Sequence, residues 1–185
     1  RGAGALRAWL TFSSDRLVEA VADVRLASVN TRLAADLPQL DLSQLSGRVG
    51  WKQSDEGFEL NTAKLRLVTT GGLALPPVDF LLRVKPGGAR GEAGGELQAD
   101  SVELAPLVSL ADHLPLPQET RRQLAEYSPR GNLRDVIVHW SGKWSEPRQY
   151  SARGRFQQLS LNRSGRVPGF TGVSGMVEAS ERGGT

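Results

Sequence analysis

Residues 55–72 have the sequence DEGFELNTAKLRLVTTGG, in which a run rich in β-forming residues lies between two tight turns. Side chains alternate between the two faces of a strand, so Phe58 and Leu60 would share one face and Leu65 and Leu67 the other. A β-bulge accounts for such a slip, because one extra residue reverses the alternation and bends the strand. The segment therefore predicts a long strand that is bent near its middle.

Similar runs recur along the whole chain, and the run 17–33 also changes phase midway. The connections between runs are short, and strands joined by such turns must be antiparallel, because a parallel pair needs a crossover of about a dozen residues. We therefore expect a mainly β fold, a curved antiparallel meander that forms an open trough or half-barrel. The expected strands lie near 6–13, 17–33, 45–53, 57–70, 78–85, 90–104, 132–143, 148–162 and 172–180.

One segment departs from the β pattern. Leu107, Leu110 and Leu114 have the spacing of one helix face. Further along, Pro117 can occupy the first turn of a second helix, where its missing N–H group has no cost. The sequence thus predicts two short helices near 105–127, packed on one face or at one end of the sheet.

Two segments of the chain, 29–49 and 161–177, follow the same pattern. Each has a strand that ends near Asn and Arg, a loop with Pro, and then an aliphatic-Ser-Gly-x-Val motif. A repeat that cannot cover its own edges stacks against its neighbours. Because the chain also lacks an initiator Met and ends within an expected hairpin turn, we interpret residues 1–185 as a single β-rich fragment of a larger repeat-containing protein. An incomplete repeat would begin near 156–185.

The composition argues against several classes of function. The chain has 23 Lys and Arg residues against 20 Asp and Glu residues, and the excess is scattered, whereas nucleic-acid-binding domains concentrate it in a patch. It has no cysteine, which excludes disulfides, thiol nucleophiles and thiolate metal sites. No run approaches the about 20 apolar residues of a membrane-spanning helix. We therefore expect no nucleic-acid partner.

No catalytic constellation is evident. Asp135 and the second of two histidines, His139, would share a strand face, but two ligands do not make a metal site. The glycine-rich run 87–95 lacks the Lys-Ser/Thr pair and the following helix of a phosphate loop. Ser174 lacks the spacing of a nucleophile elbow. We predict that the chain is not an enzyme and has no metal site and no cofactor.

The order of several short motifs resembles the AsmA-like superfamily, and within it the large envelope proteins of the YhdP type (the DUF3971 and AsmA-like C-terminal regions). The likeness covers about residues 24–180. Its main motifs are LSGRVGW at 45–51, GELQADSVEL at 95–104, SPRGNL at 128–133 and PGFTGVSG at 168–175.

This resemblance implies a long β-sheet trough in a protein anchored in the inner membrane of Gram-negative bacteria and extending through the periplasm. Such proteins are implicated in moving phospholipid toward the outer membrane and in the envelope barrier. The resemblance brings no catalytic residues. It implies phospholipid acyl chains and neighbouring domains of the same chain as partners, with membrane contact through regions outside the fragment.

A trough that carries lipid needs a continuous apolar face. In the run 132–143, Val136, Val138 and Trp140 would share one face, and Leu133 and Ile137 the other. The residues predicted to contact lipid are Val136, Val138, Trp140, Leu65, Leu67 and Phe80. The main alternative is a structural or assembly module that pairs through its sheet edges with neighbouring domains or partner proteins. A glycan-binding β domain would instead display aromatic side chains on the outside.

Overall fold

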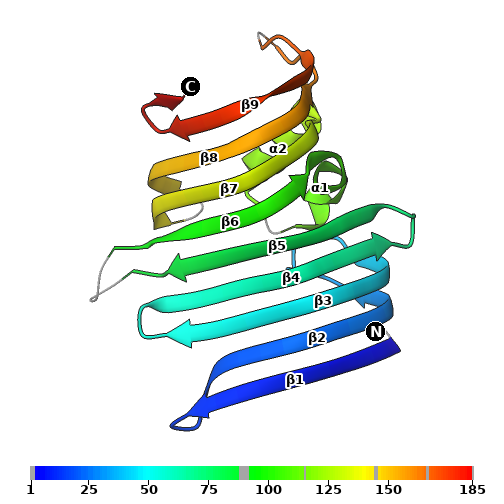
Figure 1. The fold of residues 1–185 in the computed structure, drawn as a ribbon, viewed down its shortest axis with the longest axis vertical. Helices are drawn as coiled ribbons and strands as arrows, with labels where there is room; N and C mark the ends of the chain where they lie inside the picture. Colours follow the sequence, from blue (N-terminus) through cyan, green and yellow to red (C-terminus); the bar gives the residue numbers. More distant parts are fainter. Residues whose placement is uncertain (1–2, 88–91, 115, 144–145, 166, 185) are drawn as a thin grey trace.

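The computed structural model describes residues 3–87, 92–114, 116–143, 146–165 and 167–184. All of its strands belong to one open antiparallel sheet whose order follows the sequence, with β1 and β10 at the two edges (Figure 1). This arrangement confirms the predicted meander. The strands are β1 (Ala3–Ser13), β2 (Arg16–Thr31), β3 (Leu40–Ser54), β4 (Gly57–Thr69), β5 (Ala74–Lys85), β6 (Gly94–Glu103), β7 (Arg130–Lys143), β8 (Glu146–Leu161), β9 (Phe170–Ser180) and β10 (Gly183–Gly184).

Several strands extend beyond their predicted bounds. The largest difference is in β3, which begins at Leu40, where residues before 45 were expected to form a loop. Leu40 and Leu42 pair with Thr31 and Val29 of β2 and are buried. The strand expected near 90–104 begins at Gly94, and its first two residues lie outside the described residues. The short β10 was not predicted.

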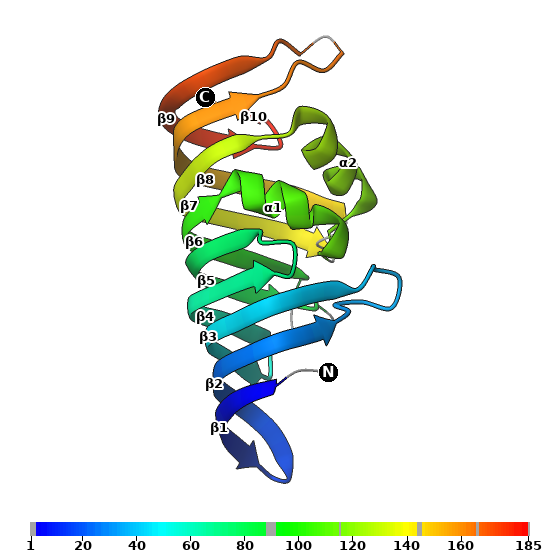
Figure 2. The ribbon, with the colours of Figure 1, turned by 90° about the vertical axis from the view of Figure 1, so that its right-hand side faces the viewer.

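Two helices lie between β6 and β7, as predicted: α1 (Leu104–Leu110) and α2 (Gln118–Tyr127), separated by a 3₁₀ turn at Ala111–His113. Pro117 has extended backbone angles and immediately precedes α2, one position earlier than expected. Figure 2 shows both helices on the concave side of the curved sheet. The sheet therefore has one face with helices packed against it and one face without.

Four strands carry a non-glycine residue in the left-handed backbone region near the middle of the strand. Ser28, Lys64, Asp135 and Gln158 each have a φ of 52°. In β4, β7 and β8 these residues coincide with register shifts, where two residues oppose one on the partner strand. Such bulges bend a strand and increase its twist. The bulge predicted in 57–70 is confirmed, whereas in β2 Ser28 has a positive φ without a register shift against β3. The bulges in β4, β7 and β8 explain why the sheet curves into a trough.

The bulges bring apolar residues that are out of step in the sequence onto one face. In β4, Thr62 pairs with Phe80 and Leu65 pairs with Val78, so Leu65 lies on the same face as Leu60. In β7 the bulge at Asp135 has the same effect and places Leu133 on the face of Val138. The prediction that Leu133 lies opposite Val138 is therefore wrong, because it assumed uninterrupted alternation.

The main hydrophobic core lies between the sheet and the C-terminal end of α1. Leu40, Leu42 and Leu110 are buried together, and the partly buried side chains packed around them are Val29, Leu45, Leu67, Leu73 and Leu114. The C-terminal end of α2 is held to the β8–β9 connection, because the backbone N–H of Asn162 donates to the carbonyl oxygen of Tyr127 at 2.8 Å. The helices thus cover the side of the trough where β4 ends and β5 begins.

The bulge at Lys64 gives a direct test of the bend. Its backbone N–H donates to the Asp79 carboxylate at 2.5 Å, and its side chain is exposed. Lys64→Val should destabilise the protein by about 1–3 kcal/mol, because β-branched residues are strained in the left-handed region. Lys64→Gly should be neutral or stabilising, since glycine adopts this conformation without strain. Both effects can be measured as shifts of the urea unfolding midpoint.

Arg66→Val is the matched control for this pair, because Arg66 is exposed in the same strand and has no positive φ. Its effect should stay within about 0.5 kcal/mol. Equal destabilisation by Lys64→Val and Arg66→Val would contradict the role of the bulge.

Candidate functional site

The concave face of the sheet is apolar along its whole length. Each residue in one row is the cross-strand partner of the next, from β1 to β9, and each is apolar. The row is Leu10, Ala20, Trp51, Leu60, Leu82, Leu97, Val138, Ala152 and Ala179. A flanking row contains Val49, Thr62, Phe80, Ala99 and, on β7, Val136. The hydroxyl of Thr62 donates to the carbonyl oxygen of Val78 at 3.2 Å, so this polar group in the apolar wall is satisfied.

The bulges divide the trough into two arms. The covered arm, which includes 65–69 of β4 and 74–78 of β5, packs against the helical segment through the Leu40–Leu42–Leu110 cluster. The open arm includes 57–62 of β4 and 80–85 of β5. Figure 1 shows α1 at the end of the strands that belongs to the covered arm. Apolar side chains of the open arm therefore face the concave interior of the trough and are not covered by the helices.

The six residues predicted to contact lipid all lie on the concave face, but in different arms. Leu65 and Leu67 belong to the covered arm, and Leu67 packs against the core cluster. Val136, Val138 and Phe80 belong to the open arm and are partly buried. Trp140 is also in the open arm, but only 7% of it is exposed.

Most residues of the central row, including Leu60, Leu82 and Leu97, were not among the predicted site residues. Each of these residues was within a predicted strand, and period-two alternation placed it on an apolar face. Only the register between strands shows that these faces join into one wall. Toward β1 the wall becomes more exposed, with 63% exposure for Leu6 and 55% for Leu10.

The convex face carries charged side chains and cross-strand ion pairs, among which lie single apolar side chains such as Leu81 and Ile137. Arg48 contacts Asp23 at 2.6 Å, and Arg83 contacts Glu59 at 2.9 Å. The hydrogen bond from the Arg48 guanidinium holds the pKa of the Asp23 carboxyl below its ordinary value of 3.8. These groups are well exposed, and surface pairs of this kind contribute little to stability. The convex face therefore has the character of a solvated outer surface.

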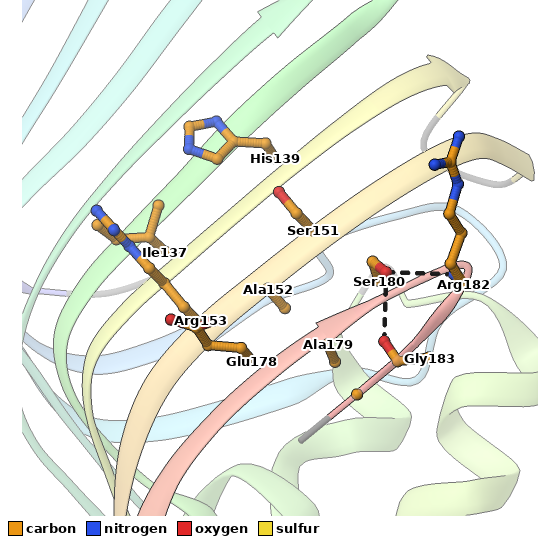
Figure 3. A pocket seen from close by; sticks show the side chains of 11 residues that line it. Ile137, His139, Ser151, Ala152, Arg153, Glu178, Ala179, Ser180, Arg182 and Gly183 are labelled. Carbon is orange, nitrogen blue, oxygen red and sulfur yellow. Dashed lines mark hydrogen bonds between the residues drawn. The ribbon is translucent and has the colours of Figure 1, made fainter.

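A hollow of about 790 Å³ lies on this polar face, between β7, β8 and the β9–β10 hairpin (Figure 3). Its lining includes Ile137, His139, Arg153 and Glu178. His139 lies 3.8 Å from Glu96, and Asp135 lies 3.6 Å from Arg155, so these two residues have different charged neighbours. In the described part of the chain, no cluster of three or more His, Asp or Glu side chains could hold a metal ion.

An open antiparallel sheet with one continuous apolar wall defines a trough-shaped, mainly β protein. The chain belongs to the YhdP family: the family model described as YhdP protein matches residues 1–185. This membership indicates an envelope protein of the AsmA-like group, and the family is not a family of enzymes. No curated protein and no solved structure matches the chain. Among the described helices, none has the length and apolar character needed to span a membrane.

Proposed function

We propose that this chain binds phospholipid acyl chains along its concave face and conducts them across the strands. It would act as a segment of an inner-membrane-anchored periplasmic protein that supports outer-membrane lipid transport and the envelope barrier. The observation that carries the proposal is the unbroken apolar row from Leu10 in β1 to Ala179 in β9. Membership of an envelope protein family is consistent with it.

The magnitudes favour such a wall as a path for lipid. Transfer of hydrocarbon out of water contributes about 0.8 kcal/mol per CH₂ group, so exposing a 16-carbon chain costs on the order of 10 kcal/mol. Nine strands spaced by about 4.8 Å give a wall about 38 Å long. One acyl chain occupies about 15 Å, half of a hydrocarbon core about 30 Å thick. A chain can therefore slide along the wall while all of its methylenes stay in apolar contact.

The open shape of the trough also accommodates the polar headgroup of the lipid. A headgroup can remain in water at the mouth of the trough while the acyl chain lies against the floor. Binding then depends on the hydrocarbon and needs no specific headgroup contact. We assign contact with the membranes to regions outside residues 1–185.

Photocrosslinking in cells tests the proposal. A benzophenone side chain is placed at Leu82, on the concave face, or at Leu81, its neighbour on the convex face, in the full-length protein that contains this segment. After irradiation, we expect phospholipid adducts by mass spectrometry at position 82 and none at position 81. Equal labelling at both positions, or none at either, would contradict the proposal.

The assembly alternative rests on β1, which lies at an edge of the sheet and is exposed throughout. An edge of this kind can accept a strand from another segment. If this is the function of the sheet, a benzophenone at Leu6 in β1 should give protein adducts, and position 82 should give no lipid adducts. The continuity of the apolar row across all the long strands is why we favour lipid.

A further inference from the structure

Two glycines on the concave face lie beneath aromatic rings of the neighbouring strand. Gly95 in β6 is the cross-strand partner of Trp140 in β7, and Gly175 in β9 is the partner of Phe156 in β8. A Cβ atom added to Gly95 would overlap Cζ2 of the indole and lie 2.5 Å from its Cη2. One added to Gly175 would lie 2.9 Å from Cζ of Phe156. Strand side chains usually stand roughly perpendicular to the sheet, whereas these rings lie over the backbone of their partners.

The burial of Trp140 agrees with a ring that lies flat. Phe58 and Tyr150 belong to the same row of cross-strand partners and are 37% and 40% exposed, whereas Trp140 is 7% exposed. What distinguishes Trp140 from these two aromatics is the glycine at the position that its ring covers. The indole of Trp140 therefore occupies the space in which a side chain at residue 95 would lie.

We propose that Gly95 and Gly175 determine how much hydrocarbon the groove can hold, by letting the rings of Trp140 and Phe156 lie on its floor. This inference rests on the proposed function. Packed sheets are about 10 Å apart, so one layer of upright side chains fills about 5 Å. A ring forced upright at either position would remove a comparable depth from the trough. The two glycines are thus specificity-determining residues of the groove wall.

Gly175→Ala is the sharper of the two possible tests. The three atoms nearest to the added Cβ all belong to the Phe156 ring, which can move, whereas a Cβ at Gly95 would also crowd the backbone carbonyl of Arg83. The displaced ring should remove apolar contact from bound lipid, and lipid occupancy should fall about fourfold for each methylene that loses its contact. In the double variant Gly175→Ala/Phe156→Leu, the flexible aliphatic side chain can bend aside, so lipid should return.

Gly50→Ala is the matched control, because a Cβ there would overlap the side-chain oxygen of Asn61 on the convex face. Full-length protein is purified without detergent exchange, and bound phospholipid per protein is counted by native mass spectrometry, with circular dichroism as the test of folding. We expect reduced lipid in Gly175→Ala, recovery in the double variant and wild-type lipid in Gly50→Ala.

Wild-type lipid in folded Gly175→Ala would overturn the inference and leave the proposed function intact. So would a loss that Phe156→Leu does not restore, because the defect would then lie in the backbone and not in the ring. Wild-type protein without any phospholipid would overturn the proposed function, and this inference with it.

Discussion

Leu42→Ala is expected to lower the free energy of unfolding by about 2–5 kcal/mol, the range for large-to-small changes at buried leucines. Leu42 is only 2% exposed and packs with Leu40 and Leu110, so it joins the sheet to the C-terminal end of α1. The cavity left by the substitution cannot be filled by shifting a single side chain, because the cluster is formed by two different elements, β3 and α1. Native proteins have a total stability of about 5–15 kcal/mol, so this loss is a large fraction of it.

Urea unfolding followed by circular dichroism measures this effect, and Leu6→Ala provides the control. Leu6 lies on the same concave face but is 63% exposed. The identical change in side chain should alter stability there by no more than about 0.5 kcal/mol. Equal losses at the two positions would show that the whole concave face is a closed core, which would contradict the division into a covered and an open arm.

The curved sheet could be predicted because the sequence carries the bend as well as the strands. In residues 57–69 the apolar positions fall out of step at Lys64, and the structure has its bulge at that residue. The helices were predictable for the same reason, since Leu107 and Leu110 have helical spacing in a segment without strand alternation. Local periodicity was sufficient for both features.

The features that depend on contacts between distant residues could not be predicted. Leu40 and Leu42 precede the motif at 45–51 with which the predicted strand begins, so they were expected to lie in a loop, yet they form the centre of the core. Their burial depends on Leu110, which lies far along the chain. The sequence also does not specify which half of the trough the helices cover. For this reason the predicted site residues were divided between the core, with Leu67, and the open arm, with Val138.

The same apolar face thus has two physical roles along one strand. In β4, Leu67 is covered by the core cluster, whereas Leu60 faces the open arm. Among the described residues, no large side chain is less than 2% exposed, so the core is thin, and its leucine cluster lies on one arm. The other arm presents apolar surface that contributes little to folding while it faces water. Covering that surface is what a hydrocarbon ligand would do, which links the thin core to the proposed function.

Val138→Asp should therefore abolish lipid binding with little effect on the fold. Val138 lies in the central row of the open arm, between Leu97 and Ala152. A carboxylate in contact with hydrocarbon is unfavourable by about 2.5–3.5 kcal/mol on membrane-insertion scales, which corresponds to about a hundredfold loss of lipid occupancy. Native mass spectrometry of the full-length protein should show the loss, and cells that depend on the variant should become sensitive to detergents excluded by an intact envelope.

Ile137→Asp is the matched control, because Ile137 is adjacent in β7 and points to the convex face, between Gln98 and Arg153. A carboxylate there is in a polar environment and can pair with the Arg153 guanidinium, so lipid occupancy and the barrier should both remain at wild-type levels. The two variants carry the same new charge one residue apart, and only the face of the sheet differs. If both lost lipid equally, or if Val138→Asp retained it, the apolar wall would not be the path of the acyl chains.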